Sequence, residues 1–135
     1  NLVLLQSKKP VLISHRNCQH IAAKESNISN KTLKLLKQNG GMMMLSFSTN
    51  GVFKDKKQKI NEIEKVVDHI DHINQYLGID KIGFGTDLQA YGRYMPEKLK
   101  TPQTYHLLKN ELLRRNYSKA DIEKIFYKNY ISFMR

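Results

Sequence analysis

Three short apolar segments alternate along this chain with longer amphipathic ones. The first covers residues 10–14 and leads to His15, the second is the unbroken run 42–45, and the third covers residues 81–86 and leads to Asp87. Near-continuous hydrophobic runs of this length are typical of strands covered on both faces, as in parallel sheets. They predict three buried parallel strands, with His15 and Asp87 at the carboxyl ends of two of them.

The segments between the strands have the periodicity of helices. Ser29 or Asn30 caps a predicted helix that stops at Asn39-Gly40-Gly41, a sequence typical of a left-handed helix end. Between residues 60 and 77, apolar side chains recur at three- and four-residue spacing. This stripe predicts an amphipathic helix that ends at Gly78.

Two further helices are expected after the third strand. One covers residues 105–115, and the other is opened by Ser118, whose Asp121 three residues on resembles a capping box. The alternation of strands and helices predicts a parallel α/β sheet with right-handed crossovers. A complete (β/α)8 barrel takes about 250 residues, so residues 1–135 would supply about three of its eight units.

The net charge of +11 suggests an anionic partner, and nucleic acid is the first to consider. Lysines are spread over nearly every segment, however, and the densest cluster, at residues 54–59, has no aromatic residues between them. Base stacking needs such aromatics. A solvated loop is the favoured interpretation, and a basic nucleic-acid-binding module is kept as the least favoured alternative.

The single Cys18 excludes an internal disulfide and a thiolate zinc site, so any metal must use His, Asp or Glu. Without an activating base nearby, Cys18 is expected to be an inert, partly buried thiol. Neither a basic leader nor an apolar run of roughly 20 residues is present, which predicts a cytoplasmic location without a membrane span.

His15 and Asp87 are the strongest candidates for chemistry. In parallel α/β folds, ligands bind at the carboxyl ends of the strands. A neutral imidazole and a carboxylate are also the ligand types of hydrolytic zinc sites. By itself the pair is weak support, because a strand-end His or Asp is more often an ordinary hydrogen-bonded group.

Four motifs, in this order and spacing, resemble the membrane (renal) dipeptidase family over essentially the whole chain: Pro-Val-Leu-Ile-Ser-His at 10–15, Val-Val-Asp-His-Ile-Asp-His-Ile at 66–73, Gly-Phe-Gly-Thr-Asp at 83–87 and Leu-Leu-Arg-Arg-Asn-Tyr-Ser at 112–118. The resemblance implies a metal-dependent (β/α)8 barrel of the amidohydrolase type. In that barrel two zinc ions activate a bridging water against the peptide bond of a dipeptide. This chain would be its C-terminal portion, about the last three β/α units.

The resemblance also implies roles for single residues. His15 matches a zinc ligand, and Asp87 matches an aspartate that contacts substrate and bridging water as the general acid/base. The other ligands of the binuclear site, an early His-x-Asp pair, a bridging glutamate and a second histidine, have no match in this sequence. Arg16, next to His15, is a candidate for contact with substrate.

Several positions depart from the family pattern. Ser26 stands where an arginine usually pairs with the substrate carboxylate, and serine cannot form that bidentate ion pair. Arg16 can replace the charge from another direction, although a solvent-facing side chain is the favoured interpretation. Residues 88–90 replace a Phe-Asp-Gly sequence, and Lys98 replaces a glycine whose positive φ a lysine adopts less readily. These departures fit relaxed selection or a changed substrate.

His69 and His72 lie three apart on the predicted helix, but its apolar stripe is expected to leave them on a solvent face, as structural rather than metal-binding residues. His20 is expected to be an ordinary polar loop residue.

Two readings share this fold. In the first, the chain is part of a dipeptidase, inactive alone and restored by an N-terminal half-barrel. In the second, it is a non-catalytic remnant. Open sheet edges and an unpacked inner face of residues 42–45 predict self-association or binding to that half-barrel.

Overall fold

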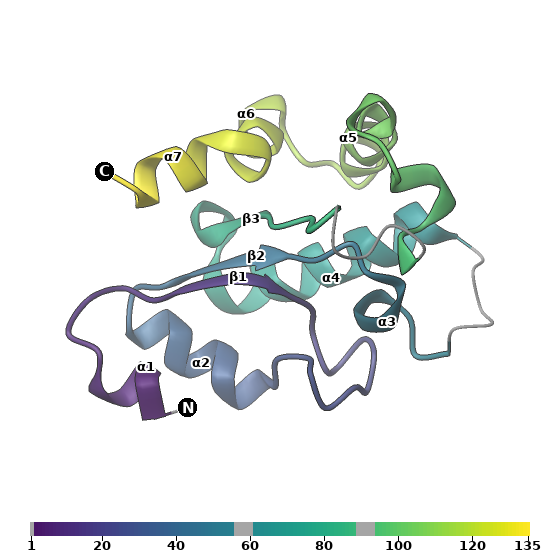
Figure 1. Cartoon of the computed structure of the whole chain (residues 1–135). Helices are drawn as coiled ribbons and strands as arrows, with labels where there is room; N and C mark the ends of the chain where they lie inside the picture. The colour runs from purple at the N-terminus through teal and green to yellow at the C-terminus, as the bar shows by residue number, and fades with distance from the viewer. Residues whose placement is uncertain (1, 56–60, 89–93) are drawn as a thin grey trace.

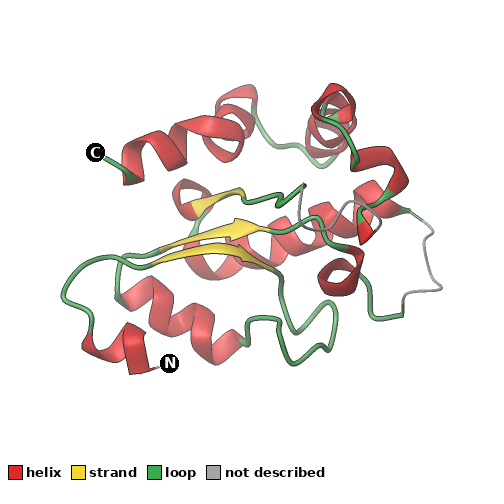
Figure 2. Cartoon of the chain, in the orientation of Figure 1, coloured by secondary structure: helices red, strands yellow, loops and turns green. Residues whose placement is uncertain are grey.

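The computed structural model describes residues 2–55, 61–88 and 94–135. Part of the lysine cluster, together with Gln89 and Ala90, lies outside the described residues. Strands β1 (Leu12–Arg16), β2 (Met42–Leu45) and β3 (Ile82–Phe84) form one parallel sheet in the order β1-β2-β3. The three predicted parallel strands are thereby confirmed (Figure 2).

The helices begin and end close to the predicted positions where an amphipathic stripe or a cap marks them. They are α1 (Leu2–Gln6), α2 (Asn30–Gln38), α3 (Thr49–Val52), α4 (Glu62–Leu77), α5 (His106–Arg114), α6 (Lys119–Glu123) and α7 (Asn129–Phe133). A wider π-type turn, Lys124–Lys128, joins α6 to α7. Ser29 caps α2 by accepting a hydrogen bond from the Thr32 backbone at 3.2 Å. The short helices α1 and α3 were not predicted.

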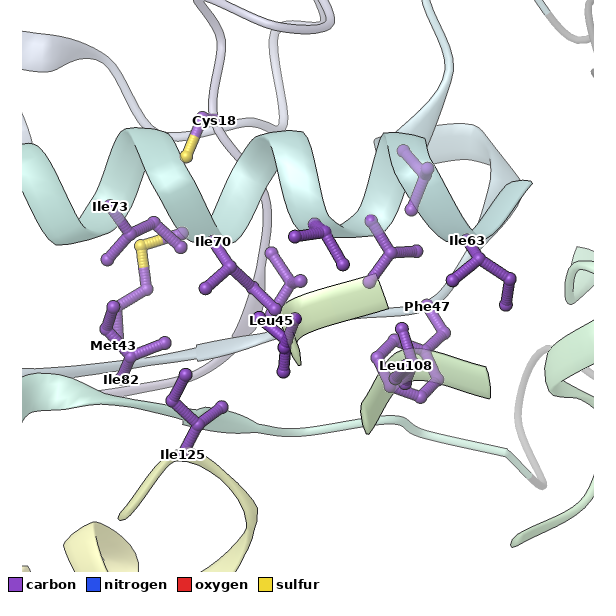
Figure 3. Close-up of a cluster of buried hydrophobic side chains, with 14 of the residues drawn as sticks. Cys18, Met43, Leu45, Phe47, Ile63, Ile70, Ile73, Ile82, Leu108 and Ile125 are labelled. Carbon is purple, nitrogen blue, oxygen red and sulfur yellow. The ribbon is translucent and has the colours of Figure 1, made fainter. Parts of the chain in front are cut away.

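The helices pack on both sides of the three-stranded sheet (Figure 1). Helix α2 lies along β1 and β2, α4 runs behind β2 and β3, and the helices after residue 118 lie beside β3. Figure 3 shows isoleucines of α4 packed over side chains of β2 and β3, together with Leu108 of α5 and Ile125 of the π-type turn. Apolar burial of this kind is the main stabilising term of the fold.

The inner face of β2 is closed more completely than the sequence predicts. Met42 is fully buried and only Met44 keeps partial exposure, so the expectation of a largely unpacked inner face is wrong. The reason is Gly83, which pairs with Met44 and has no side chain. The Met42 methyl group fills that space, since a Cβ built on Gly83 would lie 2.8 Å from it.

The expectation that His69 and His72 lie on a solvent face of α4 is also wrong, because His69 is fully buried and His72 is only 7% exposed. The loop after β1 folds over this side of the helix. The Cys18 backbone N–H donates to His69 Nδ1 at 3.0 Å, so Nε2 carries the proton and donates to the Val52 carbonyl at 3.0 Å. Both ring nitrogens of His69 therefore serve the fold.

Around this histidine the loop packs closely. Cys18 is fully buried rather than partly buried as predicted, and burial raises the pKa of its thiol to about 12, which disfavours the reactive thiolate. His20 stacks on His72 with ring centroids 4.7 Å apart, and His72 Nε2 lies 2.7 Å from Asn30 Oδ1. His20 is thus a packing residue of this loop.

Arg115 ties two of the four sequence motifs together. Its guanidinium donates to Asp68 at 2.9 Å, to Asp71 at 2.6 Å and to Glu111 at 2.7 Å. Tyr117 donates a further bond to Asp71 at 2.6 Å. The motif at 112–118 is therefore the clamp that fixes α5 against α4, which carries the motif at 66–73.

We expect Arg115→Gln to lower the free energy of unfolding by about 2 kcal/mol, because it removes charge-assisted hydrogen bonds from partly buried carboxylates. Urea unfolding followed by circular dichroism measures this change. Arg114→Gln is the matched control: among the residues that the structure describes, Arg114 pairs with Glu111 alone, and its side chain is 68% exposed. Equal losses in the two variants would contradict the clamp.

Candidate functional site

The carboxyl end of β1 carries the first predicted site residue. His15 is half-buried, and its Nδ1 lies 2.7 Å from the Ser14 hydroxyl. If His15 binds a metal through Nε2, its Nδ1 carries the proton and donates to the Ser14 hydroxyl, which fixes the ring orientation. Arg16 follows with an exposed side chain, as expected, and its Nη1 donates to the His15 carbonyl at 3.1 Å.

The carboxyl end of β3 reaches the same edge of the sheet. Gly85 packs directly on the Ser14 carbonyl, since a Cβ built on it would lie 1.7 Å from that oxygen. Asp87, two residues further on, adopts a left-handed backbone with φ of 54°. A non-glycine residue in this region is uncommon, and such residues cluster at functional sites. The motifs at 10–15 and 83–87 therefore meet at Ser14 and Gly85. Ser14 directly precedes His15, and Gly85 lies two residues before Asp87.

A pocket of about 280 Å³ opens beside His15, between the loops that follow β1 and β2. Its described lining residues are His15, Arg16, Asn17, Ser26, Asn27, Ser46, Ser48, Asn50 and Gly51. Ser26 thus faces the same pocket as His15, at the position where the resemblance leads one to expect an arginine. Asp87 is not among the described lining residues.

Sequence reasoning missed the polar floor of this pocket. Asn17 is 1% exposed and Ser48 is 6% exposed, and neither side chain has a hydrogen-bond partner among the described residues. The Oδ1 of Asn50 is also buried and has no hydrogen-bond partner among the described residues. A signal was present: Asn17 follows His15 by two positions, and polar Ser46 and Ser48 interrupt the apolar pattern just after the second strand.

The other departures from the family pattern lie elsewhere. Leu88 packs against the hydrophobic core. Lys98 lies in the turn Glu97–Leu99, where its backbone N–H donates to Glu62 at 3.3 Å. It is not among the described non-glycine residues with positive φ, so the strain expected for lysine at this position is wrong.

The residues present do not form a zinc site by themselves. Within residues 2–55, 61–88 and 94–135, no three His, Cys, Asp or Glu side chains cluster closely enough to hold a metal ion. A metal site that included His15 would therefore need further ligands from outside these segments. In the same part of the chain, no helix has the length and hydrophobicity needed to cross a bilayer.

Comparison with known sequences places this geometry in a family. The sequence profile of membrane dipeptidase (peptidase family M19) matches residues 1–135. Dipeptidase 3 of Homo sapiens is 32% identical over 133 residues, which are 98% of this chain and 26% of that protein. Dipeptidase verJ of Clonostachys rogersoniana is 30% identical over 132 residues, 98% of this chain and 33% of that protein. The chain thus spans a quarter to a third of these relatives.

Solved structures share the fold. A metallo peptidase from Rhodobacter sphaeroides, liganded with a phosphinate mimic of the dipeptide L-Ala-D-Ala, superposes with a TM-score of 0.89 at 22% identity. The match covers 97% of this chain and 37% of that one. An amidohydrolase from Pseudomonas aeruginosa gives a TM-score of 0.83 at 22% identity, over 99% of this chain and 47% of that one. By the match over its full length, this chain belongs to the membrane dipeptidase family, peptidase family M19.

Proposed function

We propose that this chain supplies the last three β/α units of a zinc-dependent dipeptidase barrel of the amidohydrolase type. It is inactive alone and hydrolyses the peptide bond of dipeptides when an N-terminal half-barrel or a self-associated copy completes the site. The observation that carries the proposal is the meeting of two family motifs at one sheet edge, where Gly85 packs on Ser14 beside an oriented His15.

Each candidate residue has a role in this proposal. His15 contributes one zinc ligand, with Ser14 holding its ring in place. Asp87 acts as the general acid/base and contacts substrate from its left-handed turn. Arg16, at the mouth of the pocket, contacts the substrate. Zinc, when bound, lowers the pKa of a bound water and polarises a carbonyl.

A second candidate function, a non-catalytic remnant, is favoured by one observation. Ser26 lines the pocket at the position where the family resemblance places an arginine. In that case the fold persists and dipeptide hydrolysis does not.

Coexpression with the N-terminal half of a related barrel tests the proposal. Zinc-dependent hydrolysis of alanyl dipeptides should appear in the assembled protein, and His15→Ala should lower kcat/KM by at least about 100-fold. Asp87→Asn should lower kcat by about 100-fold or more. His106→Ala, an exposed histidine on α5, is the matched control.

The outcomes separate the two candidates. An assembled, zinc-loaded protein without hydrolysis would support the remnant. Equal losses in the His15 and His106 variants would show that hydrolysis does not depend on His15.

A further inference from the structure

The floor of the pocket beside His15 contains a side chain whose hydrogen-bonding groups are unused. Asn17 is 1% exposed, yet neither its Nδ2 nor its Oδ1 has a partner among the described residues. Burying an unpaired amide is costly, and natural proteins keep few such groups. A buried, unpaired amide that lines a pocket is therefore suited to a ligand rather than to the fold.

The surroundings hold this amide in place. Gly51 lets Asn17 lie against its backbone, since a Cβ built on Gly51 would be 2.5 Å from Asn17 Nδ2. The Gly51 carbonyl in turn accepts a hydrogen bond from Asn27 Nδ2 at 2.8 Å, and the same Nδ2 donates to the Ala22 carbonyl at 2.9 Å. The floor is thus built by packing and hydrogen bonds before any ligand binds.

The unpaired atoms define the chemistry of that ligand. Asn17 offers a donor NH2 group and an acceptor oxygen, the Ser48 hydroxyl can donate or accept, and Asn50 adds an acceptor oxygen. A carboxylate accepts only and would leave the amide oxygens unpaired, whereas an ammonium donates only and would leave Asn17 Nδ2 unpaired. An uncharged amide both donates and accepts. Because both ends of Asn17 are unpaired, exchanging its O and N assignments does not alter this argument.

Charged groups stand outside the floor. Arg16 is exposed and donates to the His15 carbonyl, and Lys24 and Glu25 line a neighbouring hollow beyond Ser26 and Asn50. Apart from His15 and Arg16, the described lining residues of the pocket are asparagine, serine and glycine, which carry no charge.

We propose that Asn17, with Ser48 and Asn50, forms a subsite that binds the carboxamide group of a peptide substrate. The inference rests on the proposed function for its substrate class, because a peptide is the expected ligand only if His15 belongs to a peptidase site. The carboxamide can come from a glutamine or asparagine side chain or from an amidated C-terminus.

Binding to the purified chain, followed by ¹⁵N NMR of side-chain amides, tests the proposal without requiring activity. Two matched pairs differ only in carboxamide against carboxylate: Ala-Gln with Ala-Glu, and Ala-Gly-NH2 with Ala-Gly. At least one carboxamide should shift the Asn17 NH2 signals and bind at least about tenfold tighter than its carboxylate partner. Which pair responds identifies the source of the carboxamide.

Asn17→Leu, which keeps the branched shape, should abolish this preference and raise the Tm by about 3 °C because it removes unpaired buried groups. If the leucine does not pack, Asn17→Ala should still abolish the preference. Equal or tighter binding of the carboxylates, or a preference that survives in both variants, would overturn the proposal. Failure of the completed barrel to hydrolyse dipeptides would leave this binding result intact, so the two hypotheses fail separately.

Discussion

Gly85→Ala is expected to destabilise the fold by about 3 kcal/mol or more, because overpacking against backbone cannot be relieved by a rotamer change. The added Cβ would lie 1.7 Å from the Ser14 carbonyl oxygen and 2.8 Å from its carbon, with Met44 Cβ at 3.1 Å on another side. Either β1 or β3 would have to move. Urea unfolding followed by circular dichroism measures the loss of folding free energy. A variant that does not fold at all would also agree with this prediction.

Gly40→Ala is the control for the general effect of replacing a glycine. Gly40 has a φ of 72°, and the one neighbour that a Cβ there would meet within 4 Å, among the described residues, is Pro10 Cγ at 3.9 Å. Alanine at this position bears a conformational cost of about 1 kcal/mol without a clash. If Gly85→Ala cost no more than Gly40→Ala, the close approach of the two strand ends would not be a constraint on the fold.

The arrangement of strands and helices was predictable because it depends on local signals. The apolar run of β2, the cap at Ser29 and the stripe of α4 each specify an element within its own residues. Helix α1 was not predictable in this way. It spans five residues, and none of them is buried, so no apolar stripe marks this segment as a helix in the sequence.

The environment of α4 could not be predicted because it depends on a contact across 51 residues, from Cys18 to His69. The apolar stripe indicates which side faces the sheet, but a loop can cover the opposite side as well. His69 therefore appeared to be a solvent residue in the sequence, and the loop after β1 makes it a buried one.

The candidate site was predictable at its strand ends and not at its floor. His15 and Asp87 follow apolar runs and match family motifs, which is a signal within the sequence. Asn17 and Ser48 are ordinary polar loop residues until the fold places them in one pocket. The four motifs fall into two contacting pairs: one pair clamps α4 to α5 through Arg115, and the other closes the sheet edge at Ser14 and Gly85.

Mild acid is expected to destabilise this fold through His69. Burial lowers its pKa from 6.5 to about 4, because a charged imidazolium would lose hydration inside the protein. Between these values the unfolded chain binds a proton that the folded chain does not. Stability from neutral His69 is therefore fully present above pH 6.5 and is lost as the pH falls toward 4, by about 3 kcal/mol in total.

The loss of stability can be measured as the urea midpoint of unfolding from pH 7.5 to 4.5. The paired carboxylates titrate below this pH range. Hydrogen bonds from Arg114 and Arg115 hold the pKa of Glu111 at about 2, so its contribution falls only at lower pH. His69→Gln should be less stable at pH 7.5 but flatter in its pH dependence, since His69 no longer titrates. A smaller slope should remain, because burial also lowers the pKa of His72. His106→Gln, at an exposed position, should retain the wild-type slope. A wild-type stability that stays constant between pH 7 and 5 would mean that the imidazolium is accommodated by movement of the loop from Cys18, and that the contact between this loop and α4 opens at little cost.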